Sequence, residues 1–362
     1  MAMQHESNAH KKEANSGKKR RILIVSNTYP SAQKKYSGIF VKNQYEELLR
    51  QSAGQEQIDI FYMERSITGA LMSIVKYLLL FFRFIPYLFK KYEVVHLHFF
   101  IPLIAMVWFY KLLRPKTKLI VTFHGGDVIK QFRKRNEWLF KPMAKKVDLA
   151  IPVGKHVASL VQKKLNITNI MVLPVGVDNR VFYPDAEAKK IYDFIFVGSF
   201  FHVKGIDILY DTICKLPKTT RFCIVGKGAA YEPKFAVLID QEYDIVIKID
   251  QSHEQLRGLY NQAKFLVLPS RSEGFPTVTM EAMYCGTPVI TSDIPQFKEQ
   301  VTEGENGFMF ASENASELYR LLEKTIKLPE ERYLKMSGHA RESFPELRLD
   351  IICAKILNEY RC

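Results

Sequence analysis

Two carboxylates, Glu273 and Glu281, stand on either side of a Gly-Phe-Pro break at 274–276. On one continuous helix, eight residues would place them about 80° out of line. The break instead puts Glu273 in a loop and Glu281 about one turn into the helix that follows. The free backbone N–H groups of that helix start favour a phosphate. Two carboxylates that can accept hydrogen bonds from hydroxyl groups, next to a phosphate-binding helix start, are suited to binding a sugar nucleotide.

Local signals support this geometry. An apolar strand is expected at 265–268, so Glu273 follows a strand's carboxyl end, where open α/β sheets bind ligands. Pro276 suits the first helical position, and Gly286 suits the helix end. A loop carboxylate and an ordinary surface glutamate would show the same spacing. Spacing alone does not decide between these interpretations.

A second group of polar residues follows the strand expected at 118–123. His124 and Asp127 surround two glycines there. In a cleft His124 could bond a sugar hydroxyl, and Asp127 could do so or accept a proton from an acceptor. The alternative is a structural histidine at a strand end.

Phosphate-binding candidates follow three other strands. Gly38 stands in the loop after the strand at 21–26, Lys204 lies just beyond the strand at 193–197, and Arg271 precedes Glu273 by two residues. A lysine near a strand end can carry the charge of a diphosphate. Gly38 could also belong to a plain turn, and Lys204 could simply be solvated.

These residues require two arrays of alternating strands and helices. The strands are expected at 21–26, 58–63, 93–98, 118–123, 148–152 and 170–175, and then at 193–197, 221–225, 245–249, 265–268 and 288–290. A turn-rich stretch at 173–184 separates the arrays. We therefore predict an α/β protein with two doubly wound, Rossmann-like domains that face a cleft. The expected division is a disordered basic tail (1–20), an acceptor domain (21–178), a nucleotide-sugar domain (179–345) and a C-terminal helix (346–362).

Composition limits the alternatives. The 362 residues carry a formal net charge of +14 and five scattered cysteines, which suggests a reducing compartment without a disulfide framework. The basic start has no apolar core of a secretory signal. No zinc-finger spacing or aromatic-interleaved RNA-binding motif occurs, so no nucleic-acid partner is expected.

Two segments raise the possibility of contact with an anionic membrane. The apolar helix expected at 70–89 has a narrow polar stripe that includes Leu80, Arg83 and Lys90, and the basic helix expected at 130–146 holds seven Lys or Arg against one Glu. Either helix could lie in a membrane interface. The alternative is a packed helix with its basic stripe in water.

Several motifs occur in one order: Gly38, HGGD at 124–127, PVGVD at 174–178, VGS at 197–199 before Lys204-Gly205, IVGKG at 224–228, SEGFP at 272–276 before Glu281, and CGTPVI at 285–290. From Arg21 onward this chain resembles the retaining glycosyltransferases of family four, which have the GT-B fold and use nucleotide-sugar donors. The Glu-x7-Glu motif is the most specific part of the resemblance.

The resemblance implies roles for individual residues. Glu273 would contact the donor sugar, and Glu281 the ribose. Lys204 would bind the diphosphate with the backbone N–H groups of Gly274, Phe275 and Thr277 around Pro276. Gly38 would let the first loop approach, and His124 would hold the sugar near the reacting carbon.

The resemblance also implies a mechanism. The anomeric configuration would be kept, with the leaving phosphate as base, without a metal or other cofactor. The final helix would return to the first domain.

One departure affects the donor site. Ser199 stands where the family usually has arginine, and Arg271 and Lys227 are the candidates to replace that cation. The leading interpretation is transfer of a hexose from a UDP- or GDP-sugar to a lipid-linked or glycan acceptor of a surface polysaccharide. The enzyme would work in the cytoplasm, peripherally on the inner face of the plasma membrane. The alternatives are a nucleotide-sugar epimerase of the same fold and a non-catalytic sugar-nucleotide-binding protein.

Overall fold

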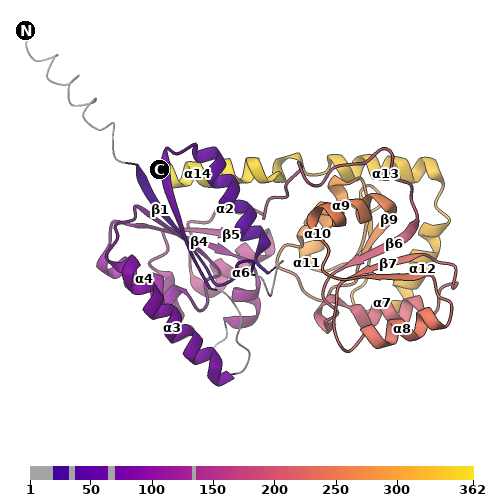
Figure 1. The fold of residues 1–362 in the computed structure, drawn as a ribbon, viewed down its shortest axis with the longest axis horizontal. Helices are drawn as coiled ribbons and strands as arrows, with labels where there is room; N and C mark the ends of the chain where they lie inside the picture. Colours follow the sequence, from indigo (N-terminus) through magenta and orange to yellow (C-terminus); the bar gives the residue numbers. More distant parts are fainter. Residues whose placement is uncertain (1–18, 32–36, 64–69, 133–135) are drawn as a thin grey trace, which may run out of the picture.

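The computed structural model describes residues 19–31, 37–63, 70–132 and 136–362. Two parallel sheets, each covered by helices, form two domains (Figure 1). The predicted fold class is confirmed. Apolar runs produce strands that are buried on both faces, as expected for parallel sheets between helices.

The first domain has a five-stranded sheet in the order β2-β1-β3-β4-β5. Its strands are β1 (Arg20–Ser26), β2 (Glu56–Tyr62), β3 (Val94–His98), β4 (Lys118–Phe123) and β5 (Leu149–Pro152). Its helices are α2 (Ile39–Ser52), α3 (Ala70–Leu88), α4 (Ile104–Leu113), the short π-helix η1 (Asp127–Gln131), α5 (Glu137–Ala144) and α6 (Lys155–Leu165). The sheet order reverses between β1 and β3, which is the kind of switch point where such sheets bind ligands.

The second domain has a six-stranded sheet in the order β11-β10-β9-β6-β7-β8. Its strands are β6 (Tyr192–Val197), β7 (Phe222–Val225), β8 (Ile245–Lys248), β9 (Ala263–Leu268), β10 (Val289–Ser292) and β11 (Gly307–Phe310). Its helical segments are η3 (His202–Lys204), α7 (Ile206–Ile213), α8 (Glu232–Asp240), α9 (His253–Gln262), α10 (Thr277–Tyr284), α11 (Pro295–Lys298), α12 (Ala315–Ile326) and α13 (Glu330–Glu342). Strand β11, which completes one edge, has no counterpart among the predicted strands.

The chain crosses between the domains twice at one place. Val177, on the outward crossing, donates its N–H to the Leu347 carbonyl and accepts from the Leu349 N–H, at 3.1 and 2.9 Å. A short helix, η4 (Pro345–Leu347), precedes the return, and α14 (Leu349–Arg361) then packs along α2 of the first domain (Figure 1).

Three predicted elements are wrong. The segment 170–175 forms backbone hydrogen bonds beside β5 but no strand, and Pro174 has no N–H to continue a ladder. The basic helix at 130–146 is instead η1 followed by the separate helix α5, with 133–135 outside the described residues. The C-terminal helix predicted at 346–362 begins only at Leu349, because the short helix η4 (Pro345–Leu347) precedes it.

Tyr360 fixes α14 to the first sheet. Its side chain is fully buried, and its hydroxyl lies 2.6 Å from Nδ1 of His96 on β3. Arg361 pairs with Glu56 on β2 at 2.6 Å. Helix α14 therefore makes polar contacts both in the interior of the first domain and at its surface.

We predict that Tyr360→Phe lowers the free energy of unfolding by about 1–3 kcal/mol, because it leaves a buried imidazole nitrogen without its partner. Urea denaturation measures this difference. The same change at half-exposed Tyr183 is the matched control and should stay within about 0.5 kcal/mol of wild type. Equal effects of the two substitutions would contradict a specific Tyr360–His96 interaction.

Candidate active site

The predicted site residues gather where the carboxyl ends of the two sheets meet. His124 follows β4, Lys204 follows β6 in η3, and Glu273 follows β9. The close approach of two backbones joins the domains there. A Cβ built on Gly274 would lie 2.0 Å from the His124 carbonyl oxygen, so only glycine fits. The SEGFP turn of the second domain thus touches the HGG turn of the first.

Neighbouring residues strengthen this junction. Phe275 packs against the cores of both domains. Glu299, at the end of α11, accepts the backbone N–H groups of Lys155 and His156 at 2.7 and 2.8 Å, and so caps α6 from the other domain. A carboxylate is favourable at a helix N-terminus. The sequence analysis missed Glu299, which carries no local signal of this role.

Lys204 and Glu273 form an ion pair. The lysine Nζ lies 2.7 and 2.8 Å from the two carboxylate oxygens. The lysine is partly exposed, whereas the carboxylate is almost covered. Lys204 therefore presents a partly exposed cation, and both oxygens of Glu273 accept from it.

Glu281 lies deeper in the second domain. It is 8% exposed on α10, and the Tyr260 hydroxyl lies 3.1 Å from its Oε2. Burial raises the pKa of this carboxyl. Thr277 opens α10 after Pro276, as predicted to within one residue, and Gly286 follows the helix with a left-handed φ of 72°.

Gly38 lies in the loop after β1 and precedes α2. Its φ is 72°, and a Cβ would lie 2.7 Å from the Thr28 carbonyl carbon. This position therefore requires glycine. Residues 32–36 of the same loop lie outside the described part of the chain.

The imidazoles of His96, His98 and His124 form a stacked column. The ring of His98 lies between those of His96 and His124, with centroids 4.6 and 5.3 Å away. Burial lowers the pKa of all three, that of His98 to about 3, so the rings are neutral at pH 7. The neutral ring of His124 can therefore offer hydrogen bonds but no positive charge. In the sequence, the feature that indicates this column is the pair of histidines at the end of β3.

Asp127 is buried, whereas the predicted contact with a sugar hydroxyl or an acceptor needs an accessible carboxylate. Its side chain is 1% exposed, and its oxygens accept the N–H groups of Phe100 and Val128 at 3.0 and 3.1 Å. Burial raises its pKa to about 6. The carboxyl group thus holds the turn after β4, and this geometry argues against direct contact with an acceptor.

The guanidinium of Arg271 is likewise already bonded to other side chains. Its guanidinium bonds Asp207 at 2.6 and 2.7 Å and Glu313 at 2.5 and 2.7 Å. The expectation that it replaces the missing arginine at exposed Ser199 is therefore not met in this structure. Lys227 also pairs with a carboxylate, that of Asp250, at 3.0 Å. Lys204 remains the predicted cation next to Glu273.

Each of the two domains matches a family model of known proteins. Residues 182–343 match the family model described as glycosyl transferases group 1, and residues 38–180 match glycosyltransferase family 4. An uncharacterised glycosyltransferase of Methanocaldococcus jannaschii is 29% identical over 262 residues, which is 66% of this chain and 70% of that protein.

Two further similarities concern a bacterial enzyme and a solved structure. The lipopolysaccharide core biosynthesis mannosyltransferase LpsB of Rhizobium meliloti is 28% identical over 223 residues, 56% of this chain and 60% of LpsB. The structure of Anabaena HepE in complex with UDP and glucose has a TM-score of 0.73 at 15% identity, and the match covers 94% of this chain and 99% of HepE. At this identity the likeness to HepE shows the fold alone.

The buried histidines predict acid sensitivity. The unfolded chain takes up a proton on each of them below about pH 6.5, whereas the folded chain does not, so stability falls as pH falls. We predict that His96→Gln reduces the loss of unfolding free energy between pH 6 and 5 by about 1.4 kcal/mol, which is the contribution of one proton. Denaturation at each pH measures this loss. The exposed control His339→Gln should keep the wild-type loss, and an unchanged loss in His96→Gln would contradict the prediction.

Proposed function

We propose that this chain moves a hexose from a UDP- or GDP-sugar to a hydroxyl acceptor with retention of the anomeric configuration, because residues 182–343 match the group 1 glycosyltransferases and residues 38–180 match glycosyltransferase family 4. The observation that carries this proposal is the meeting of the His124 turn with the Lys204–Glu273 pair at the start of α10. One domain supplies a neutral hydrogen-bonding ring, and the other supplies a cation, a carboxylate and free backbone N–H groups.

In the proposed complex, the diphosphate lies at the start of α10. The N–H groups of Gly274, Phe275 and Thr277 and the Lys204 ammonium bind its oxygens. Glu273 accepts hydroxyl groups of the sugar, and Glu281 accepts those of the ribose. The lysine supplies the positive charge needed for the leaving group, so the proposal includes no bound metal or other cofactor.

The proposed chemistry occurs on one face of the sugar. The acceptor oxygen bonds to the anomeric carbon as the bond from that carbon to the phosphate oxygen breaks. The acceptor proton passes to the departing phosphate, which leaves as a nucleoside diphosphate. His124 binds the sugar during this step, and no protein carboxylate has to act as a general acid or base.

The acceptor is proposed to be a lipid-linked or glycan intermediate of a bacterial-type surface polysaccharide. Similarity to the lipopolysaccharide mannosyltransferase LpsB supports this class of pathway. An epimerase would interconvert nucleotide sugars without transfer, and a binding protein would leave them intact. Product analysis distinguishes these two alternatives from glycosyl transfer.

We predict that Glu273→Gln lowers kcat/KM about 10- to 100-fold, because hydrogen bonds to an ionised group contribute about 1.5–3 kcal/mol. A thermal-shift screen of UDP-, GDP- and ADP-sugars first identifies the donor, since a bound ligand raises stability. Glu331→Gln, on exposed α13, makes the same chemical change and should retain wild-type activity. Full activity of Glu273→Gln would exclude the proposed sugar contact.

We further propose that the first domain binds an anionic membrane, on the inner face of the plasma membrane. Large apolar side chains are exposed on the adjacent helices α3 and α4, where Phe81 and Phe109 bring their rings within 6.4 Å. We call this surface the α3–α4 face; it comprises Leu78, Leu79, Phe81, Phe82, Phe89, Phe109, Leu112 and Leu113. Exposed apolar patches of this kind mark interaction sites.

This arrangement differs from the predicted polar stripe. Leu80, which was placed in the stripe, is buried, whereas Phe82 and Phe89 are 64% and 78% exposed. Lys76 lies among residues whose side chains are not described. The face of α3 that points to solvent is thus largely apolar, with Arg83 beside it. Within the described residues, no helix has both the length and the apolar character needed to cross a membrane.

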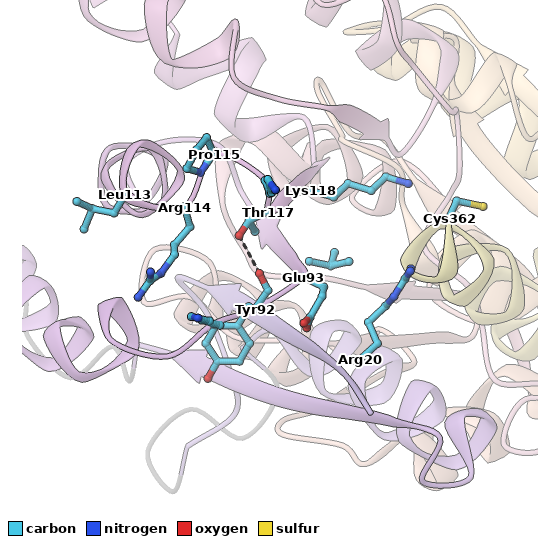
Figure 2. Close-up of a pocket in the computed structure, with 12 residues that line it drawn as sticks. Arg20, Tyr92, Glu93, Leu113, Arg114, Pro115, Thr117, Lys118 and Cys362 are labelled. Carbon is cyan, nitrogen blue, oxygen red and sulfur yellow. Dashed lines mark hydrogen bonds between the residues drawn. The ribbon is translucent and has the colours of Figure 1, made fainter. Parts of the chain in front are cut away.

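Cations adjoin the α3–α4 face at the end of α4. A hollow of about 560 Å³ lies at the amino ends of β1, β3 and β4, and Leu113 shares its lining with Arg114 and Lys116 (Figure 2). Figure 2 also shows Arg20 and Lys118 on the side of the hollow nearest the end of α14. Apolar side chains next to cations favour an anionic lipid surface.

We predict that the protein sediments with anionic vesicles at low salt and is released as salt increases, because salt screens the cations. Replacing Phe82 and Leu113 together by Ser should weaken binding severalfold by removing buried apolar area. Leu334→Ser changes an equally exposed leucine in the second domain and serves as the control. Absence of binding at low salt would remove the membrane proposal.

A further inference from the structure

Two buried residues of the first domain connect α2 to His124. Gln44 lies on α2 and His98 ends β3, and both side chains are almost fully buried. We propose that they are positioning residues that keep the proton of His124 on Nδ1, so that its neutral ring is a hydrogen-bond donor toward the nucleotide sugar. This inference rests on the proposed function, in which His124 faces the donor sugar.

The atoms that face one another determine which group donates each hydrogen bond. The amide nitrogen of Gln44 lies 3.5 Å from Nε2 of His98, and Nδ1 of His98 lies 3.1 Å from Nε2 of His124. An amide nitrogen only donates, so Nε2 of His98 accepts and its proton lies on Nδ1. That proton is donated to Nε2 of His124. The remaining proton of His124 is therefore on Nδ1.

The connection requires neutral rings. A cationic imidazole has two N–H donors and no acceptor, so a charged His98 could not accept from Gln44. His98 is fully buried and His124 is partly buried, so a charge on either ring is costly. Burial lowers the pKa of His98 and of His124, in keeping with this requirement.

The rings are also held against rotation. His96 stacks on His98 and is itself bonded by the Tyr360 hydroxyl and by Oγ1 of Thr122, at 2.6 and 2.7 Å. Phe40 and Phe99 flank the His124 ring, with centroids 4.9 and 4.3 Å away. A 180° flip of the His124 ring would put Cε1 in the place of Nε2 and lose the bond to His98.

The position of this proton matters for the ligand. Hydroxyl and phosphate oxygens of a nucleotide sugar accept a hydrogen bond from an N–H group. Within the described residues, Nδ1 of His124 has no hydrogen-bond partner, so it remains for the ligand. If the protons were reversed, Nδ1 would present a lone pair and could not donate to a phosphate oxygen.

The test combines nitrogen NMR of the full chain, labelled at histidine, with kinetics on the donor identified above. In wild type we expect the proton of His124 on Nδ1. Gln44→Glu replaces the donor by a carboxylate that only accepts, so the protons of His98 and His124 should both move to Nε2. KM for the nucleotide sugar should then rise at least tenfold. Gln162→Glu adds the same charge on exposed α6 and should change neither measurement.

Two results would overturn the inference: a wild-type His124 protonated on Nε2, or a reversed proton order in Gln44→Glu with unchanged KM. The uncharged variant Gln44→Met is a second test if the glutamate variant does not fold, and it should lose the single fixed tautomer. The wild-type spectrum needs no substitution and no activity. A protein that binds no nucleotide sugar would refute the proposed function, while the spectrum would still decide the position of the proton.

Discussion

The structure depends on one constraint, the pairing of the two chain crossings between the domains. Val177 bonds both Leu347 and Leu349, and a Cβ on Gly176 would lie 2.6 Å from the Leu349 Cα. The second domain is thus attached through two adjacent segments rather than one flexible linker. Helix α14 then packs on α2, which fixes the returning segment to the first domain. These contacts bring the carboxyl ends of both sheets together.

The candidate site exists only because of that placement. Gly274 approaches the His124 carbonyl closely, Phe275 packs on both cores, and Glu299 caps α6 across the junction. A small displacement of one domain would separate the neutral ring from the Lys204–Glu273 pair. Effective catalysis depends on holding such groups within about 0.5 Å of their working geometry. Domain placement is therefore part of the site's chemistry.

The interior of the first domain contains a cluster of polar side chains. His96, His98, Thr122 and Tyr360 are buried together and bonded to one another or stacked. A buried network is favourable only when its members are satisfied. The same interactions that hold α14 in place therefore also reach the ring that faces the proposed donor.

The sequence by itself determined the strand and helix arrays and the placement of Lys204, His124 and Glu273 beyond strand ends. Apolar runs and turn residues are local signals, and parallel strands end at one edge. Only the tertiary structure decided which partners these side chains meet. It buried Asp127 among backbone N–H groups, paired Arg271 with Asp207, and turned the apolar side of α3 outward. Such partners lie far apart in the chain, and local periodicity carries no information about them.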